Sequence, residues 1–364
     1  MNTHKKPLNE HYPDFRETLS DWFRRYQRDL PWRRTDDPYR IWVSEVMLQQ
    51  TQVKKVVDYY EKFINQFPNV RDLAAAPLQD VLKVWEGLGY YARARNLHKA
   101  AQVIVDELDG KIPTDYATFR KLPGIGDYSA AAVQSIAFNA PHAAVDGNIK
   151  RVLARLFLME APINDAKSAK FFQQKADALL DSNEPGLFNQ AVMELGAVIC
   201  RPQSPACLVC PVNAFCEAFH ATRQAEFPKR RKTKPTPEHH LTVGVIYNKT
   251  GEVLLTQRQL DGLLGGLWEF PGGQIAEGET AENACVRNIA EIVNLSITNV
   301  RYLTRVRHAY THFKIVVDVF LCDYASGEVV LNGPRDAKWV TVAAVQDYPL
   351  PRATHKFLDE LEEA

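Results

Sequence analysis

The sequence contains no run of about 18 apolar residues, the length that a membrane-spanning helix requires. Its first stretch, Met1 to Pro13, is polar and lacks the apolar segment of a secretory signal peptide. The chain also lacks a net charge, because 44 Lys and Arg residues balance 44 Asp and Glu residues. We therefore expect a cytoplasmic protein without a membrane span, on which any strongly basic surface must be local.

Cysteine is scarce as well, but its positions are informative. Four of the six cysteines fall in one short segment with the spacing Cys200-x6-Cys207-x2-Cys210-x5-Cys216. This clustering favours a metal centre in a reducing compartment over the disulfide framework of a secreted protein. Four thiolates so close in sequence can bind either one zinc ion or an iron–sulfur cluster. We expect Cys285 and Cys322, outside this pattern, to fill space in a core.

The first 220 residues show the apolar period of α-helices. A length of 364 residues suggests two or three domains. Apolar residues recur at intervals of three and four in several stretches, namely Phe15–Tyr26, Val53–Phe67, Leu97–Leu108, Ile149–Leu158 and Phe171–Leu180. Residues 1–220 are therefore expected to form an all-α domain.

The composition changes near residue 221. The segment from Pro228 to Pro237 is basic, proline-rich and without apolar period, and it predicts a linker over residues 221–238. Residues 239–364 then show β-type patterns at Leu241–Tyr247, Val253–Leu255, Ile315–Leu321 and Ala337–Val342, with helices at Ala281–Val293 and near Ala353–Leu361. This second domain is expected to be α+β.

A glycine-containing turn joins two helical segments within Leu122–Val133. Pro123 should end the first helix, and Gly124 and Gly126 allow a tight hairpin with positive φ. Asp127 resembles an N-cap for the alanine-rich helix that follows. The free N–H groups of such a hairpin attract phosphate, although a Gly-x-Gly turn alone is weak support for that function.

Two acidic residues, Glu45 and Asp146, lie in sequence surroundings that suit a role in catalysis. Glu45 interrupts an apolar run, and burial there would raise its pKa so that it could donate a proton near neutral pH. Asp146 precedes a helix expected to begin near Gly147, whose N–H groups would keep the carboxylate ionised. The simpler interpretations are a helix edge for Glu45 and a plain N-cap for Asp146. An acid and an anion together suit cleavage of a bond in which the leaving group needs a proton and the remaining group becomes cationic.

These motifs occur in the order found in the endonuclease-III-like DNA glycosylases, and the segment Ile41–Thr51 resembles the catalytic helix of the MutY-type adenine DNA glycosylases. The resemblance covers about Phe15 to Leu361. It implies an all-α helix-hairpin-helix glycosylase domain with an iron–sulfur loop at residues 200–216, followed by an α+β Nudix-like domain. By this resemblance Glu45 protonates adenine, Asp146 stabilises or bonds to the sugar, and Asn148 positions water and sugar.

Position 128 separates two branches of this superfamily. Relatives that also cut the strand carry a lysine there as a Schiff-base nucleophile, whereas this chain has Tyr128. The resemblance therefore implies base removal without an efficient lyase step.

The same resemblance assigns further residues. It implies an adenine pocket that includes Arg28, Trp32, Arg33 and Gln190. It implies contacts to DNA, or insertion into the base stack, by Gln50, Thr51, Leu88, Tyr90, Gly124 and Gly126. A [4Fe–4S] cluster would be held by Cys200, Cys207, Cys210 and Cys216, and a structural cation by the carbonyl groups of Arg120, Leu122 and Ile125.

The C-terminal domain contains a segment that resembles the Nudix box, from Gly272 to Leu295. Gly273, Glu279, Arg287 and Glu291 fit that pattern, but Asn288, Ile292 and Asn294 replace two glutamates and a glycine. Because two oxygen ligands are missing, Mg²⁺ binding should be crippled while the fold is kept. In the family resembled, such a domain reads 8-oxoguanine, and Tyr310, Thr311 and His312 match the loop that does so.

The expected partner is double-stranded DNA containing 8-oxoguanine·adenine or guanine·adenine pairs, bound by a monomer without membrane association. If the source is bacterial, the protein would associate with the nucleoid. The linker is either a solvated spacer or a further contact to phosphates. Three alternatives remain at this point: a pyrimidine glycosylase and lyase of the endonuclease-III type, a Nudix pyrophosphatase on a DNA-binding module, and a DNA-binding protein without activity.

Overall fold

The computed structural model describes residues 8–232 and 235–362. Contacts divide the chain into two units. The helical unit comprises Met1–Ala74 and Lys99–Thr233, and the sheet unit comprises Ala75–His98 and Lys234–Ala364. The chain therefore enters the sheet unit twice, and each unit is described by itself.

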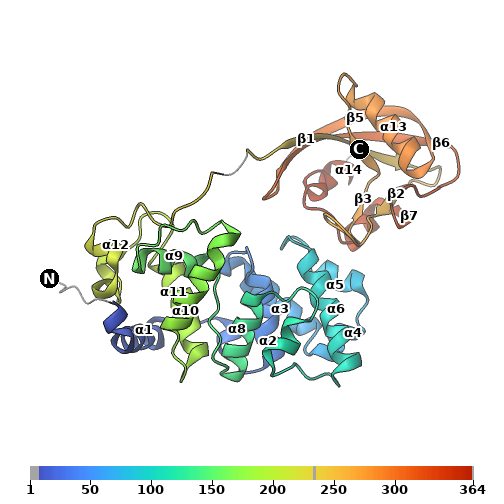
Figure 1. Ribbon diagram of the computed structural model, residues 1–364. Coiled ribbons are helices and arrows are strands. Elements are labelled where there is room, and N and C mark those ends of the chain that lie inside the picture. The colour runs from blue at the N-terminus through green and yellow to red at the C-terminus, as the bar shows by residue number, and fades with distance from the viewer. Residues whose placement is uncertain (1–7, 233–234, 363–364) are drawn as a thin grey trace. The chain divides into compact units, whose positions relative to one another are not determined.

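The helical region is built from α-helices and short 3₁₀ turns, coloured blue to yellow-green in Figure 1. Each of the five helical stretches expected from periodicity overlaps a helix of the structure. The α-helices are α1 Tyr12–Tyr26, α2 Pro38–Leu48, α3 Val53–Gln66, α4 Val70–Ala75, α5 Leu78–Trp85, α6 Ala92–Glu107, α7 Tyr116–Arg120, α8 Asp127–Phe138, α9 Gly147–Leu156, α10 Ala169–Leu179, α11 Pro185–Val198 and α12 Glu217–His220. The 3₁₀ turns are η1 Leu8–Glu10, η2 Pro31–Arg33, η3 Ala166–Ser168, η4 Cys207–Val209 and η5 Asn213–Phe215.

Helices α8 and α11 cross closely because small residues line their contact. A Cβ atom added to Gly186 would lie 2.4 Å from the carbonyl oxygen of Ser135, so only glycine fits at this crossing. Asn189 of α11 donates a side-chain hydrogen bond of 2.8 Å to the Ser135 hydroxyl. Helix α8 also packs against α2, so the alanine-rich sequence of α8 places α2 and α11 on either side of it.

The turn between α7 and α8 is a helix-hairpin-helix element. Gly124 has a φ of 75°, whereas Gly126 has a φ of −93°, so only the first glycine needs the left-handed region. The prediction that Asp127 caps α8 was wrong. Gly126 occupies the N-cap, and the Asp127 carboxylate instead accepts a 2.6 Å hydrogen bond from Arg120.

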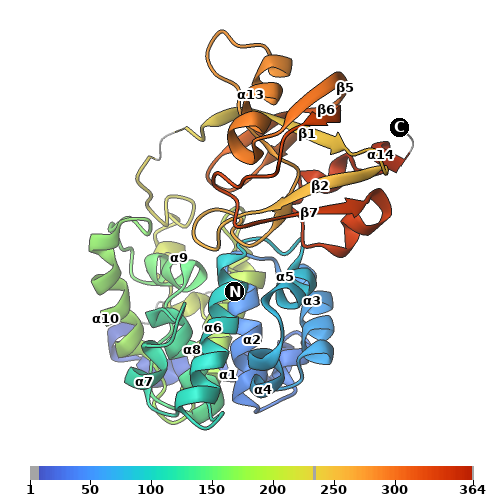
Figure 2. The same cartoon turned by 90° about the vertical axis from the view of Figure 1, so that its right-hand side faces the viewer.

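The sheet unit is organised around a mixed β-sheet (Figure 2). Over the described residues seven strands form this sheet in the order β3-β2-β1-β6-β5, with β4 paired to β1 and β7 paired to β2. Strands β1 and β6 are parallel from Glu238 opposite Lys314 to Tyr247 opposite Asp323, and the other pairs are antiparallel. The strands are β1 Glu238–Tyr247, β2 Glu252–Gln257, β3 Trp268–Glu269, β4 Gly272–Gln274, β5 Ser296–Ala309, β6 Lys314–Ser326 and β7 Asp336–Thr341.

The two faces of this sheet are covered differently. Helix α13 (Ala281–Val293) packs on one face through Cys285 and Ile289, and the side chain of Cys322 joins the same core. The other face packs against the C-terminal elements η6 (Val342–Asp347), η7 (Thr354–Lys356) and α14 (Leu358–Glu362). Both extra cysteines are fully buried, as expected from the sequence. The expected C-terminal helix is therefore divided between η7 and α14.

The segment Ala75–His98 belongs to the sheet unit through specific polar contacts. The Gln79 amide oxygen accepts a 2.9 Å hydrogen bond from the indole of Trp268, and its amide nitrogen donates to the Gly266 carbonyl at 3.2 Å. The Glu86 carboxylate accepts from the Leu350 backbone N–H at 2.7 Å. In the part of the chain that the structure describes, no helix is both long and apolar enough to cross a membrane.

Candidate active site

Glu45 is buried in the helical unit, in the last turn of α2. Its side chain is 5% exposed, and Tyr128 of α8 donates a 2.8 Å hydrogen bond to its Oε2 atom. The pKa of Glu45 is raised to about 7, mainly by burial and to a smaller extent by the charge of Asp146, while the hydrogen bond from Tyr128 offsets only part of the cost of desolvating the carboxylate. Glu45 can therefore hold a proton at neutral pH, as the sequence predicted for a carboxyl group in a dry pocket.

Asp146 is the N-cap of α9, which begins at Gly147 as expected. Its Oδ1 atom accepts a 2.7 Å hydrogen bond from the backbone N–H of Ile149. Burial raises the pKa of Asp146 from its usual value, while the N–H groups of Ile149 and Asn148 lower it. The N–H groups of the helix thus offset only part of the cost of burial, and the carboxylate is more basic than an exposed one.

The two carboxyl groups line one small cavity of about 130 Å³. Most of the residues predicted for the chemistry or for an adenine pocket contribute to the same lining, namely Arg28, Trp32, Arg33, Glu45, Thr51, Tyr128, Asp146, Asn148 and Gln190. Trp32 is 7% exposed and forms an edge contact with Tyr60, 5.4 Å between ring centres. Elements far apart in sequence therefore bring an acid, a second carboxylate and an aromatic wall together.

The sequence interpretation missed Glu194, which organises one wall of this cavity. Its side chain on α11 is 1% exposed. Arg28 donates to both of its oxygens at 2.7 Å, and Arg33 donates at 2.9 Å. These two guanidinium groups lower the pKa of Glu194 to about 2 despite its burial. Glu194 interrupts an apolar helix as Glu45 does, and that shared feature was the available signal.

Asn148 is tied to the cysteine-containing loop through Arg151. The Arg151 guanidinium donates to the Asn148 side-chain oxygen at 2.9 Å, to the Gly196 carbonyl at 2.7 Å and to the Cys200 carbonyl at 2.7 Å. Arg151 is buried, and burial lowers its pKa. The cavity and the loop are therefore joined by a chain of hydrogen bonds.

The four clustered cysteines are free thiols gathered within the loop that follows α11. The Arg155 guanidinium donates to the Cys200 sulfur at 3.2 Å. Burial, together with the neighbouring thiols of Cys200 and Cys207, raises the pKa of Cys216 to about 11. The donor set is soft and anionic when deprotonated, which suits iron–sulfur chemistry or zinc. Over the described residues, no group of three or more His, Cys, Asp or Glu side chains is arranged to hold a single metal ion.

A wider cleft of about 750 Å³ is lined by part of the cavity's residues and by the hairpin. Its lining includes the predicted DNA-contacting residues Gln50, Thr51, Gly124 and Gly126, with Asp146 and Asn148. Gln50 is exposed and has a φ of 56°, a strained conformation for a residue with a side chain. The hairpin carbonyls are engaged in part, since Leu122 accepts from Ile125 N–H at 3.1 Å and Ile125 accepts from Arg120 at 2.9 Å.

Leu88 and Tyr90 belong to the sheet unit. Leu88 is 5% exposed, so its side chain packs inside the protein. Tyr90 is half-buried with a φ of 51°, and its hydroxyl forms a hydrogen bond with the Thr311 hydroxyl. Thr311 and His312 are exposed in the loop between β5 and β6.

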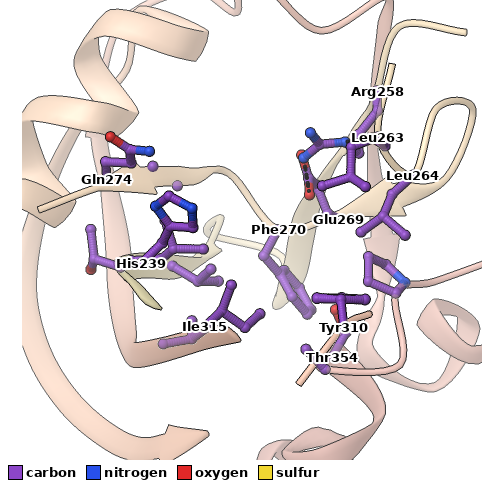
Figure 3. A pocket seen from close by; sticks show the side chains of 18 of the residues that line it. His239, Arg258, Leu263, Leu264, Glu269, Phe270, Gln274, Tyr310, Ile315 and Thr354 are labelled. Carbon is purple, nitrogen blue, oxygen red and sulfur yellow. Dashed lines mark hydrogen bonds and ion pairs between the residues drawn. The ribbon is translucent and has the colours of Figure 1, made fainter. Parts of the chain in front are cut away.

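A cavity of about 470 Å³ lies in the sheet unit (Figure 3). Arg258 and Glu269 form an ion pair of 2.7 Å at one end, and His239 and Gln274 lie at the other. Tyr310 lines this cavity and stacks on Phe313, with ring centres 4.7 Å apart. The Tyr310 ring therefore packs in the cavity wall, whereas Thr311 and His312 beside it are exposed.

In the segment that resembles a Nudix box, the carboxylates of two glutamates are neutralised by an arginine of the same segment. Arg287 donates to both oxygens of Glu279, at 2.8 and 2.7 Å, and to Glu291 at 3.1 Å. This guanidinium lowers the pKa of Glu279 to about 2. Asn288 is buried beneath Gly273 and donates to the Gln274 and Ala284 carbonyls, so it has a packing role. Both glutamates, Glu279 just before α13 and Glu291 on it, are thus paired with Arg287 of α13.

The helix-hairpin-helix element and the pair of buried carboxyl groups beside it define a DNA glycosylase of base excision repair. Comparisons with known proteins agree with this class. Residues 43–179 match the family described as "HhH-GPD superfamily base excision DNA repair protein", and residues 242–360 match the NUDIX domain family. The human adenine DNA glycosylase is 34% identical over 383 residues, which cover 90% of this chain and 70% of the relative.

The chain belongs to the adenine DNA glycosylase family, and it is an adenine-specific DNA glycosylase that acts on DNA. A thermostable thymine-DNA glycosylase is similar in structure, with a TM-score of 0.54 and 30% identity over 58% of this chain and 98% of that one. Endonuclease III in a trapped covalent DNA complex has a TM-score of 0.51 and 23% identity over 59% of this chain and 98% of that one, a likeness in fold.

Proposed function

We propose that this enzyme removes adenine paired with 8-oxoguanine or guanine, after rotating it out of the duplex, and leaves an intact abasic strand. One observation carries the proposal: Glu45 and Asp146 line the same 130 Å³ cavity in different electrostatic surroundings. Two carboxyl groups that differ in this way can serve as acid and anion in one reaction. Extrusion of the base costs a few kcal/mol of stacking and pairing, which contacts in the cavity would offset.

Glu45 supplies the proton. Because its pKa is about 7, the Glu45 carboxyl group is protonated in about half of the enzyme molecules at neutral pH. The proton passes to a ring nitrogen of adenine, the N-glycosidic bond breaks, and the bonding electron pair leaves with the base. Asp146 stabilises the oxocarbenium ion that remains on the sugar, either through space or by a transient bond. Water positioned by Asn148 then adds to the sugar carbon and loses a proton to the Glu45 carboxylate, which restores the acid.

The pocket around the base would be shaped by Arg28, Trp32, Arg33 and Gln190. The two arginines are already paired with Glu194, so their role is to hold a rigid polar wall against which the base is placed. Trp32 would pack on the flat face of adenine. Tyr128 would keep Glu45 oriented through the 2.8 Å hydrogen bond.

Hydrolysis without strand cleavage is supported by the lining of the cavity. Among the described residues that line it there is no lysine, and position 128 carries tyrosine. A lyase of the endonuclease-III type requires an amine for Schiff-base formation. Borohydride reduction during turnover tests this: efficient covalent trapping of DNA at a lysine would overturn the monofunctional assignment.

The four clustered cysteines would hold a [4Fe–4S] cluster. Their thiol chemistry, freedom from disulfides and contact with Arg155 support this choice, and zinc is the alternative. When bound, such a cluster would cross-link the loop from Cys200 to Cys216 and could exchange an electron. A structural cation at the carbonyls of Arg120, Leu122 and Ile125 is a further proposal from the family resemblance.

Recognition of 8-oxoguanine is proposed for Tyr310, Thr311 and His312. The exposure of Thr311 and His312 at the β5–β6 loop supports contacts by these two, while Tyr310 would support the loop from the cavity wall. Gln50, Thr51, Leu88 and Tyr90 are proposed to fill or line the vacated stack, with buried Leu88 in a supporting role. Nudix hydrolysis is disfavoured by the pairing of Arg287 with Glu279 and Glu291.

We retain the division into a glycosylase domain over 1–220, a linker over 221–238 and a Nudix-like domain over 239–364 as a proposal. The enzyme is proposed to act as a monomer and, in a bacterium, at the nucleoid. The decisive experiment is single-turnover adenine release from duplexes with 8-oxoguanine or thymine opposite adenine. Release from the first alone, leaving an intact abasic strand, is expected. Equal release from both, or none from the first, would overturn the proposal.

A further inference from the structure

The first part of the basic segment after the cysteine loop is attached to the helical unit, which a solvated spacer would not be. The ring of Phe227 is 1% exposed, and its carbonyl accepts a 3.0 Å hydrogen bond from Arg155. The Lys229 carbonyl accepts from the backbone N–H of Ile163 at 3.0 Å. We call residues 227–231 the strap.

Asn164 fixes the end of the strap by a reciprocal pair of hydrogen bonds. Its side-chain nitrogen donates to the Arg231 carbonyl at 3.0 Å, and its side-chain oxygen accepts from the Arg231 N–H at 2.8 Å. The Arg231 guanidinium forms an ion pair of 2.7 Å with Asp165. The Lys229 ammonium lies near Glu160 and Glu226 and over the ring of Phe227. The positive charges on both sides of residue 230 are therefore matched by carboxylates of the protein.

Arg230, between them, is different. It is exposed, and within the described chain it has neither an ion pair nor a hydrogen bond. It lines the 750 Å³ cleft together with Gly124, Gly126, Asp146 and Arg151. Arg151 and Arg230 line the same cleft, so the two cations lie near each other. Two like charges held close together in a cleft are stabilised by an anion.

We infer that Arg230 binds a backbone phosphate of the adenine-carrying strand, and that the strap is a DNA-contacting element of the helical unit. This rests on the proposed function, in which the sugar of the target nucleotide lies at Asp146. Phosphates flank every sugar of the strand, so a sugar at Asp146 brings one of them to the wall that Arg230 occupies. The hairpin glycines belong to the same lining, and N–H groups of such a hairpin suit a second phosphate.

Binding to a duplex with a stable tetrahydrofuran abasic analogue opposite 8-oxoguanine tests the inference without requiring chemistry. Arg230→Ala should weaken binding about tenfold, as expected for one charge-assisted contact. It should also reduce the slope of log K against log salt concentration by about 1. Lys232→Ala is the matched control, because it removes the same charge from an exposed position that does not line the cleft. That control should change binding less than twofold.

A second measurement locates the contact. Single methylphosphonate linkages, which remove one phosphate charge at a time, are placed on either side of the target nucleotide. At one linkage the loss caused by Arg230→Ala should disappear, because the charge it would contact is already absent. Additive losses at every linkage, or equal salt slopes for the wild type and Arg230→Ala, would overturn the inference.

The strap's anchoring gives an independent variant. Asn164→Ala keeps the positive charge of Arg230 but removes both hydrogen bonds to Arg231. Its affinity for the duplex should lie between those of the wild type and Arg230→Ala. The double variant should bind no more tightly than Arg230→Ala alone. Failure of the wild type to release adenine would sink the proposed function alone, since these binding experiments involve no bond cleavage.

Discussion

Three carboxyl groups in the helical unit titrate differently because their neighbours differ. Glu45 has a pKa of about 7, the pKa of Asp146 is raised, and Glu194 has a pKa of about 2. Burial acts on all three, but Glu45 has a neutral hydroxyl as its partner, whereas Glu194 has two guanidinium groups. One pocket therefore contains an acid that keeps its proton and a carboxylate that does not.

The rate of adenine release should depend on the protonation of Glu45. Because its carboxyl group must be protonated to act, the single-turnover rate should be high below pH 7 and fall as the pH rises through about 7. Glu45→Gln cannot supply this proton, and its rate should be about a hundredfold to ten-thousandfold lower. Since ionisation of buried Glu45 costs free energy, the variant should also melt at a higher temperature than the wild type at pH 8 but not at pH 4. A variant that kept the wild-type pH profile would rule out Glu45 as the acid.

Asp146→Asn separates the negative charge from the capping function. Asparagine can still accept a hydrogen bond from the N–H of Ile149, so helix α9 and the binding of DNA should be preserved. The developing positive charge on the sugar would lose its counterion, and cleavage should fall by about three orders of magnitude or more. Comparable single-turnover rates for the two proteins would refute the role of Asp146.

Glu194→Gln tests the wall of the pocket through stability. The pKa of Glu194 lies at about 2 in the folded protein against a usual 4.5, so its stabilising effect is present above pH 4.5 and is lost as the pH falls toward 2. At pH 7 the unfolding free energy of the variant should be lower by about 3 kcal/mol, because Arg28 and Arg33 lose their carboxylate partner. Glu184→Gln, which breaks the exposed pair with Arg24, is the control and should cost less than about 1 kcal/mol. Chemical denaturation at pH 7 and pH 3 measures both.

At the scale of secondary-structure elements, the crossing of α8 and α11 positions two walls of the candidate active site. Tyr128 lies on α8 and Glu194 on α11, so a shift of either helix would move a cavity wall. Periodicity alone did not predict this arrangement, because both helices are apolar on nearly every side and show little amphipathic pattern. The arrangement of the two helices is determined instead by the close packing of small residues such as Gly186 and Ser135 at their contact.

Gly186→Ala should show how tight this crossing is. The new methyl group would meet the Ser135 carbonyl at 2.4 Å, so α11 must move or strain must be absorbed, at a cost of about 1–3 kcal/mol. Gly147→Ala is a suitable comparison, since its added methyl group meets nothing within 4 Å. Thermal unfolding of the two variants should show a clear loss for the first and no loss for the second. Equal melting temperatures would mean that the crossing is more open than described.

Strand β5 marks a limit of sequence reasoning at the same scale. It spans Ser296–Ala309, yet its sequence did not predict a strand. It lies at the edge of the sheet, several of its side chains are exposed, and its pairing with β6 shifts register at three places. Each shift interrupts the alternation of apolar and polar residues on which strand prediction depends. Helix α13, with a buried face and a clear period, was predicted at its observed bounds. The start of strand β6 was predicted within one residue, but the strand continues past the predicted end at Leu321 to Ser326.

At the scale of the whole molecule, two units contribute to one proposed reaction. Replacing Thr311 and His312 together by alanine should narrow the difference in adenine-release rate between duplexes with 8-oxoguanine and with guanine opposite adenine. The helical unit, which contains the carboxyl groups, should remain able to cleave, since neither residue lines its cavity. Single-turnover rates on both duplexes decide the matter. An unchanged ratio of the two rates would show that the lesion is recognised by other residues.

Residue identity and order singled out Glu45 and Asp146, which the structure brings into one cavity, but partners distant in sequence could not be predicted in this way. The pairing of Glu194 with Arg28 and Arg33 joins positions more than 160 residues apart. The attachment of the strap through Asn164 and Asp165 is likewise a contact between distant segments, and a basic, proline-rich composition gives no sign of it. Local pattern predicts the elements, and only the packed structure shows which charges neutralise one another.

The path of the chain through the two units has a consequence for how the protein can be divided. A fragment ending at residue 232 would keep Gln79 and Glu86 but lose Trp268 and Leu350, their hydrogen-bond partners in the sheet unit. A fragment beginning at residue 235 would keep Trp268 and Leu350 but lack Gln79 and Glu86. The two pieces are therefore the halves of a split protein, and when mixed in solution they should associate through the contacts of the segment Ala75–His98.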